Sequence, residues 1–367
     1  NVEKEGATVP LIWYGVRSRL RVTIIPSGSS DEIVFHEVLV LEGPMLFNDR
    51  MTSIITFPKA GRFTVTIRKI SSSAPFGPGI GDYFLGGSIV DFVGLGEPDN
   101  NNNLSILKAP VRSRKIVAIG ASDTAGWCVD GNPSTSPIDF GTAGWLYEDC
   151  GLTYVAQLGE KFDADISVQA ISGIGLTQNA FAQIPWVLGN LTMPDYFNRT
   201  IQGTSKHQWN FGKESHVDLV LVSLGGNDYN HQNGDIPSNV DFSSKYVSFL
   251  SSLIEVFDDN DDDPMNYLRS ATKILCICGM GDPHEVQRDP DNDRCSPCPH
   301  VEASVEIFRK MYPKLAHRVH YKLVPCDGSV VKGTDDIGCN GHKNKLGQER
   351  VSNFLAPTLS SITGWNQ

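Results

Sequence analysis

Long apolar runs and clusters of basic residues are both missing from this sequence of 367 residues. No apolar stretch approaches the roughly 20 residues that a helix needs to span a bilayer, which excludes a protein built on membrane-spanning helices. The net charge is −11, and the 31 lysines and arginines are scattered. Nucleic acids and anionic membranes both attract clustered basic side chains, so we expect neither as a partner. The chain starts at Asn1 rather than at a methionine, and we expect any signal peptide to lie outside this sequence.

Eight cysteines and three N-x-S/T sequons are present, the sequons at Asn103, Asn190 and Asn198. Disulfides persist on the secretory route, where sequon asparagines can also carry glycans. We therefore predict a secreted or extracellular protein that is glycosylated at these asparagines. The length and the apolar fraction of 40% suit two domains with a large core. We expect a monomer that needs no cofactor.

The cysteines allow two interpretations. Cys295 and Cys298 lie in a Cys-Ser-Pro-Cys segment, and Cys276 and Cys278 are close to them in sequence, so these four could supply the thiolates of a zinc site. The secretory compartment favours disulfides instead, and we predict that all eight cysteines are paired and that no metal is bound. The first expected pairs are Cys128 with Cys150 and Cys326 with Cys339. The order in which the remaining four cysteines pair stays open.

The first part of the chain has the pattern of an all-β domain. Between residues 62 and 68, Phe63, Val65 and Ile67 alternate with polar residues, which predicts a half-buried antiparallel strand. Further strands are predicted at 33–43, 51–58 and 83–92. We predict a β-sandwich over residues 1–110, with the linker to the next domain at 96–110.

After the linker, apolar runs alternate with segments of helical periodicity. The runs predict strands buried on both faces at 116–120, 166–171, 217–225 and 272–279. The predicted helices are 246–257 and 301–312. This order predicts an α/β domain over residues 114–367, with a parallel sheet covered by helices on both sides. Ligands bind such sheets at the carboxyl ends of the strands.

Residues suited to catalysis follow three of these predicted strands. Ser122 follows the first strand, and Ser172-Gly173-Ile-Gly175 follows the second. Asn227 follows the third strand, where its amide can donate a hydrogen bond into the crevice. A histidine, His342, lies in a late loop before the last amphipathic segment. Each residue alone is ordinary in a turn or a core. Together they favour an active site at one edge of the sheet.

These four blocks, in this order, resemble the SGNH hydrolases, also called the GDSL esterase family. Ser122, Gly173, Asn227 and His342 match the four residues that name the family. The resemblance implies a flavodoxin-like, three-layer fold and a serine esterase with Ser122 as nucleophile and His342 as base. The backbone N–H groups of Ser122 and Gly173 and the amide of Asn227 would form the oxyanion hole.

A closer resemblance, over most of the chain, is to carbohydrate esterase family two. Its members join an amino-terminal sandwich of jelly-roll type to the hydrolase domain. The similar segments are 120–127, 172–176, 193–200, 209–211, 224–228 and 338–344. This resemblance implies removal of O-acetyl groups from an acetylated polysaccharide or oligosaccharide.

The sequence departs from the family pattern around the histidine. Many members have an aspartate three residues before it, where this chain has Cys339, and family two often has an aspartate where this chain has Asn340. The first block also reads Gly-Ala-Ser rather than Gly-Asp-Ser. Because the usual acid is missing, we predict a Ser-His dyad. The alternative is a triad completed by Asp327, Asp335 or Asp336.

Two other functions stay open at this point. A lipase or phospholipase on the same scaffold would use the same catalytic residues, although the sequence has no long apolar lid segment. A glycan-binding protein without catalysis would use the sandwich and keep the hydrolase core as a scaffold. Trp127 and Trp209 are candidates for stacking on sugar rings, against the simpler interpretation that they pack in the core.

Overall fold

The structure is a computed structural model. It describes residues 8–15, 18–27, 35–41, 51–57, 59–71, 90–95, 107, 112–134, 144–180, 191–200, 208–211, 216–230, 235–257, 271–279, 295, 297–339 and 341–366. The chain divides into two compact units, and the boundary between them falls at Val111 and Arg112. The predicted glycosylation sites Asn103 and Asn190 lie outside the described residues.

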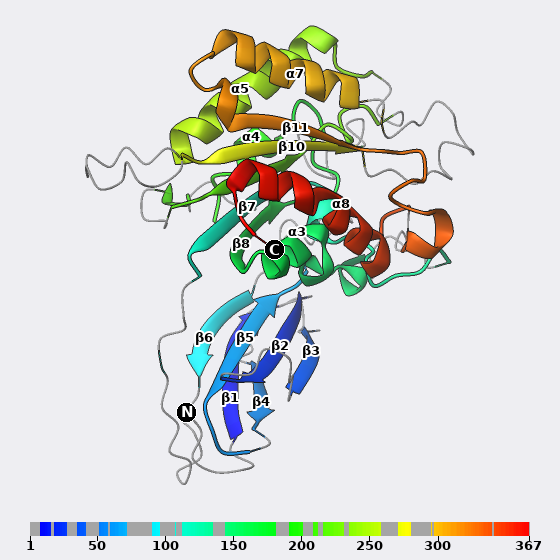
Figure 1. Cartoon of the computed structure of the whole chain (residues 1–367). Helices are drawn as coiled ribbons and strands as arrows, with labels where there is room; N and C mark the ends of the chain where they lie inside the picture. The colour runs from blue at the N-terminus through cyan, green and yellow to red at the C-terminus, as the bar shows by residue number, and fades with distance from the viewer. Residues whose placement is uncertain are drawn as a thin grey trace, which may run out of the picture. The chain divides into compact units, whose positions relative to one another are not determined.

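The first unit contains two antiparallel sheets of three strands each (Figure 1). Its strands are β1 (Thr8–Gly15), β2 (Ser18–Pro26), β3 (Phe35–Leu41), β4 (Met51–Thr56), β5 (Phe63–Lys69) and β6 (Val90–Leu95). The sheet orders are β4-β1-β6 and β3-β2-β5. Leu20, Val22 and Ile24 of β2 are buried, as is Ile55 of β4, so each sheet buries apolar side chains. A jelly-roll connection of these strands remains a prediction.

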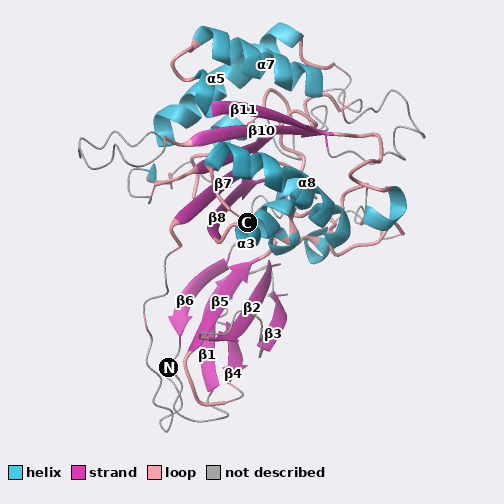
Figure 2. Cartoon of the chain, viewed as in Figure 1, coloured by secondary structure: helices cyan, strands magenta, loops and turns pink. Residues whose placement is uncertain are grey.

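A parallel sheet of five strands forms the centre of the second unit (Figure 2). Its strands are β7 (Arg114–Gly120), β8 (Ala164–Ala170), β9 (Leu219–Ser223), β10 (Lys273–Gly279) and β11 (Val319–Val324). Their order in the sheet is β8-β7-β9-β10-β11. This is the flavodoxin-like order, in which the direction of winding reverses between the first and third strands, here β7 and β9. A crevice for ligands is expected where the chain leaves these two strands.

Helices cover both faces of this sheet. They are α2 (Ser122–Ala125), α3 (Tyr154–Lys161), α4 (Met193–Tyr196), α5 (Asn239–Phe257), α7 (Cys298–Met311) and α8 (Lys345–Thr363). The helices α3 and α8 contact each other on one side, and α5 and α7 contact each other on the other side (Figure 1). In the part of the chain that the structure describes, no helix has both the length and the apolar character needed to cross a bilayer.

Alternate residues of each central strand enter the two cores. Ile116 and Ala118 of β7 belong to the same buried cluster as Val351 and Leu355 of α8. The intervening residues of β7, including Val117, are buried as well. Strands that bury both faces need nearly continuous apolar runs, which is why β7 and β9 appear in the sequence as runs rich in Ile, Val and Leu.

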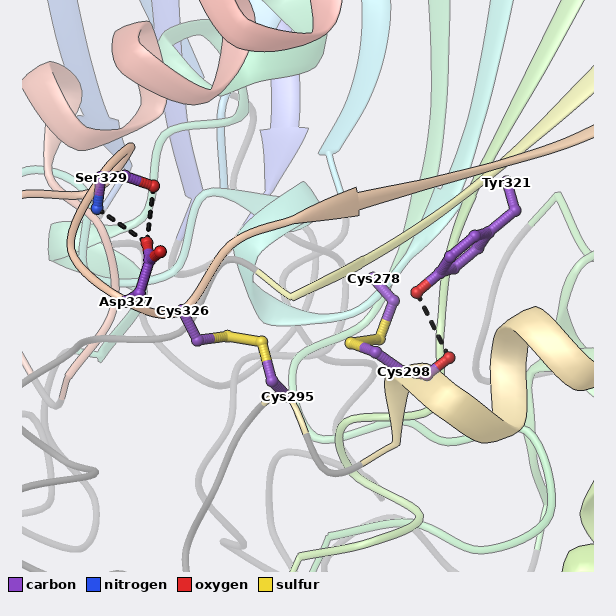
Figure 3. Close-up of a disulfide and its surroundings, with 7 residues drawn as sticks. All are labelled: Cys278, Cys295, Cys298, Tyr321, Cys326, Asp327 and Ser329. Carbon is purple, nitrogen blue, oxygen red and sulfur yellow. Dashed lines mark hydrogen bonds between the residues drawn. A yellow bond between two sulfur atoms is a disulfide. The ribbon is translucent and has the colours of Figure 1, made fainter.

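Three disulfides stabilise the second unit, and they differ from the predicted pairs. The observed pairs are Cys128–Cys339, Cys278–Cys298 and Cys295–Cys326. The prediction of Cys128–Cys150 and Cys326–Cys339 was wrong, because it joined cysteines near in sequence, whereas the fold brings distant loops together. Cys150 and Cys276 are thiols, so the prediction that all eight cysteines are paired was also wrong. Figure 3 shows the two neighbouring disulfides, which fasten β10 to the start of α7 and Cys295 to the segment after β11.

Candidate active site

Ser122 lies on the sharp turn between β7 and α2, at the edge of the sheet where the crevice is expected. The strand ends at Gly120, and the N–H groups of Thr124 and Ala125 both donate to the carbonyl of Ala121. Ser122 is therefore the first residue of the helix, and its own N–H has no partner within the helix. This geometry leaves the backbone N–H and the hydroxyl of Ser122 available at one end of the turn.

His342, which lies near the C-terminal end of the sequence, contacts Ser122. The distance from Nε2 of His342 to Oγ of Ser122 is 2.7 Å, which is a hydrogen bond. A neutral imidazole with its proton on Nδ1 accepts this hydrogen bond, and the hydroxyl then donates its proton toward a base. The structure thus brings together two residues that are 220 positions apart.

The loop that carries His342 is a tight hairpin. Ile337 and Lys343 form an antiparallel bridge, and the N–H of Gly338 donates to the carbonyl of His342 over 2.7 Å. Asn344 then ends the loop and caps α8, because its Oδ1 accepts from the N–H groups of Leu346 and Gly347. Its Nδ2 donates back to the carbonyl of Ile337. One asparagine therefore joins the hairpin to a long, well-packed helix.

Residues of α3 and α8 form hydrogen bonds with the turn that carries Ser122. The amide of Gln348 donates to the carbonyl of Asp123, and its Oε1 accepts from the N–H of Tyr154. The hydroxyl of Tyr154 forms a hydrogen bond of 3.0 Å with that of Thr124. Burial raises the pKa of Tyr154 to about 12, so this group stays a neutral phenol. The nucleophile turn therefore sits on a buried polar network rather than on apolar side chains alone.

Gly173 and Asn227 follow the neighbouring strands β8 and β9. Gly173 has a φ of 82°, a left-handed conformation that favours glycine, so the chain turns there at low cost. The Nδ2 of Asn227 donates to the carbonyl of Ile174 over 2.7 Å. The carboxamide nitrogen of asparagine carries two N–H donors. This hydrogen bond joins the loop after β9 to the loop that contains Gly173.

Asp228 holds the same two loops together more firmly, and sequence analysis did not single it out. Its buried carboxylate accepts from the N–H groups of Leu176, Thr177 and Gln178. Burial raises the pKa of the Asp228 carboxyl, and these hydrogen bonds oppose the rise. Its only signal in the sequence was its place directly after Asn227.

Two of the three aspartates proposed to complete a triad use their carboxylates in other interactions. Both carboxylate oxygens of Asp336 contact Nε of Arg350, at 2.9 and 2.8 Å. Asp327 accepts from the N–H and the hydroxyl of Ser329 (Figure 3). Asp335 is exposed. The carboxylates of Asp327 and Asp336 thus have structural partners of their own in these loops.

The two tryptophans proposed to stack on sugars have opposite environments. Trp127 is only 2% exposed and packs against Cys128 and Cys339, so it offers no face to a ligand. Its prediction as a binding residue is therefore wrong, and the packing alternative holds. The Trp209 residue is 39% exposed, and its backbone N–H donates to the carbonyl of Asn198. Asn198, the third predicted glycosylation site, is half-buried there.

The cysteines that resembled half of a zinc site are oxidised. Cys278, Cys295 and Cys298 belong to two disulfides, so they supply no thiolate ligands in this state. Within the described ranges, no group of three or more histidine, cysteine or acidic side chains is arranged to hold a metal ion.

No family model and no curated protein matches this chain. Several solved structures do share its fold. A family two carbohydrate esterase from Clostridium thermocellum, in complex with cellohexaose, is 17% identical, with a TM-score of 0.69 over 99% of this chain and 91% of that chain. A family 2 enzyme with a carbohydrate binding domain from Corynascus thermopiles (Myceliophthora fergusii) is 19% identical, with a TM-score of 0.70 over 99% and 92% of the two chains. An acetyl xylan esterase from Butyrivibrio proteoclasticus is 14% identical, with a TM-score of 0.68 over 100% and 90%. These likenesses establish the fold and confirm, at that level, the resemblance drawn from the sequence motifs.

Proposed function

We propose that this protein is a serine esterase that removes O-acetyl groups from carbohydrates. The observation that carries the proposal is the hydrogen bond between Ser122 and His342. A serine hydroxyl is a weak nucleophile near neutral pH, and an imidazole in contact with it supplies the base that it needs. The fold, shared with family two carbohydrate esterases, supports an acyl ester as substrate.

The reaction proceeds in two steps. The Oγ of Ser122 attacks the acetyl carbonyl while Nε2 of His342 takes the hydroxyl proton, and His342 then returns that proton to the leaving sugar hydroxyl. Water, activated by the same imidazole, attacks the acetyl-serine and releases acetate. The negative oxygen of each tetrahedral intermediate accepts from the N–H groups of Ser122 and Gly173 and from Nδ2 of Asn227. These donors follow adjacent strands of one sheet, β7, β8 and β9.

The carbohydrate part of the proposal has separate support. Proteins with this fold include one solved with cellohexaose and one named as an acetyl xylan esterase. We therefore assign an acetylated polysaccharide or oligosaccharide as substrate and the exposed Trp209 as a surface for a sugar ring. Three disulfides support an oxidising, extracellular location.

The test compares p-nitrophenyl acetate with esters of longer acyl chains, and acetate release from acetylated xylan. We expect the acetate ester to be preferred and Ser122→Ala to lower turnover by more than about a hundredfold. Ser252→Ala, on the exposed side of α5, is the matched control and should leave turnover unchanged. Preference for long acyl chains would indicate a lipase instead. Binding of glycans without turnover would indicate a non-catalytic protein.

A further inference from the structure

Each residue of the proposed dyad is followed in the chain by a charged residue, and these two charged residues form an ion pair. Nζ of Lys343 lies 2.9 Å from Oδ2 of Asp123. The side chain of Lys343 is completely buried, and that of Asp123 is 21% exposed. Asp123 follows Ser122, and Lys343 follows His342, so their Cα atoms are about 3.8 Å from those of the dyad. The ion pair therefore joins the two loops at the residues that directly follow Ser122 and His342 in the chain.

Stability alone does not explain such a pair. Taking an ammonium and a carboxylate out of water costs about as much as their attraction returns, and apolar replacements are often neutral. Removing only one partner is different, because it leaves an unpaired charge in a buried place. The pair thus disfavours any arrangement that keeps one of these charges buried without the other, and so it specifies which groups of the two loops meet more than it adds stability.

A second connection joins the same two loops on the other side of His342. The disulfide Cys128–Cys339 links the segment after α2 to the hairpin, with the two Cα atoms 4.9 Å apart. Cys339 precedes His342, and Lys343 follows it. His342 is thus flanked in the chain by a covalent link and an ionic link to the nucleophile loop.

We propose that Asp123 and Lys343 are positioning residues, whose ion pair holds Nε2 of His342 against Oγ of Ser122 and balances the charge around the imidazole. This proposal rests on the function proposed for Ser122 and His342. Loss of the carboxylate leaves an ammonium near the imidazole and disfavours its protonated form. Loss of the ammonium leaves a carboxylate and favours that form. The other charged side chains at this hairpin and the start of α8 are Asp335, Lys345, Glu349 and the Asp336–Arg350 pair, and the phenol of Tyr154 on α3 interacts electrostatically with Asp123. All of these groups are present in both variants.

The experiment follows the titration of His342 by NMR of the labelled imidazole and, in parallel, the pH profile of p-nitrophenyl acetate hydrolysis. We expect Asp123→Asn to lower the midpoint and Lys343→Met to raise it, each by about one pH unit. The double variant should return the midpoint toward that of the wild type. Its kcat should still be lower by about 10²-fold with little change in KM, because the alignment of the dyad is lost.

Glu306→Gln is the matched control. It removes a carboxylate from the Glu306–Arg309 pair on α7. Arg309 donates to the carbonyl of Val319 at the start of β11, a strand that β9 and β10 separate from β7. The control should move neither the midpoint nor kcat.

If Lys343→Met does not fold, the direction of the Asp123→Asn shift decides alone. The NMR measurement needs no turnover, so an inactive wild type would overturn the proposed function without deciding the role of the pair. Midpoints that stay in place, or that move in the same direction in both variants, would overturn the positioning role.

Discussion

At the scale of single residues, the proposed chemistry depends on where an imidazole points. The reactivity assigned to Ser122 comes from the 2.7 Å contact between its Oγ and Nε2 of His342, since the carboxylate of the adjacent Asp123 pairs with Lys343. The hairpin hydrogen bonds around Gly338 and the cap at Asn344 fix the backbone on both sides of that imidazole. These backbone hydrogen bonds and loop contacts hold the proposed dyad, in a chain that has no aspartate at the two positions where the resembled family often has one.

The dyad leads to a prediction for the three aspartates near the hairpin. Replacing Asp327, Asp335 or Asp336 singly by alanine should lower turnover of an aryl acetate by less than about tenfold, since loss of a true triad acid costs about 10⁴. Asp336→Ala should lower the melting temperature, because the buried carboxylate no longer pairs with Arg350. Thermal melting followed by circular dichroism measures this loss of stability independently of turnover. A loss near a thousandfold in a folded variant would identify the missing acid.

Single residues also show what the sequence cannot reveal. Ser122, Gly173, Asn227 and His342 were identifiable because each lies in a short motif at the end of a strand or in a late loop. The partnership of Asp123 with Lys343 has no signal in a sequence, since it depends on two loops that meet only in the fold. The burial of Trp127 was equally hidden, because its neighbour Cys339 is more than 200 residues away.

At the scale of elements, the apolar runs predicted four of the five central strands. The runs of β7, β9 and β10 were visible because these strands are buried on both faces in the three-layer arrangement. The edge strand β8 is mostly half-buried, and its run was visible from alternating Ile166 and Val168. The strand β11 was not predicted, since its pattern includes half-buried and exposed residues such as Leu323. In the first unit, Val65 is 38% exposed although its alternation predicted an inward side chain. It belongs to β5, which is the last strand in the order β3-β2-β5 among the strands that the structure describes.

The disulfide between the two catalytic loops leads to a prediction at this scale. The double variant Cys128→Ser, Cys339→Ser removes a link that spans 211 residues and should cost about 2–5 kcal/mol of unfolding free energy. Turnover should fall as well, because the hairpin of His342 loses one of its connections. The matched control is Cys278→Ser, Cys298→Ser, whose link spans 20 residues and joins β10 to α7. It should lower stability and leave kcat close to that of the wild type. Equal kcat values for both double variants would contradict the role given to Cys128 and Cys339.

At the scale of the whole molecule, the cysteines are unevenly divided between the two units. All eight cysteines lie in the second unit, between Cys128 and Cys339, and the first unit has none. Pairing by closeness in sequence failed here because parallel α/β sheets bring together the loops that follow distant strands. The domain order and the class of each unit, by contrast, follow from local patterns that a sequence displays directly.

The cysteine assignment predicts two thiols in each chain. A thiol-specific reagent should detect two groups in denaturant without reductant, and eight after reduction. In the native protein, Cys276 should stay unmodified, because burial excludes the reagent and raises the pKa of the Cys276 thiol to about 12. Mass spectrometry of the alkylated peptides checks which cysteines react. Complete absence of thiols in the denatured, unreduced chain would refute the three-disulfide arrangement.

The central claim is that His342 activates Ser122 as a nucleophile, and covalent labelling tests it most directly. A fluorophosphonate forms a stable bond with an activated serine and with few others, so intact-mass measurement followed by peptide mapping locates the nucleophile. We predict one adduct in each chain, on the peptide that contains Ser122. We also predict no adduct in Ser122→Ala, and labelling at least about a hundredfold slower in His342→Ala. No adduct on the wild-type protein, or equal labelling of Ser122→Ala, would contradict the account.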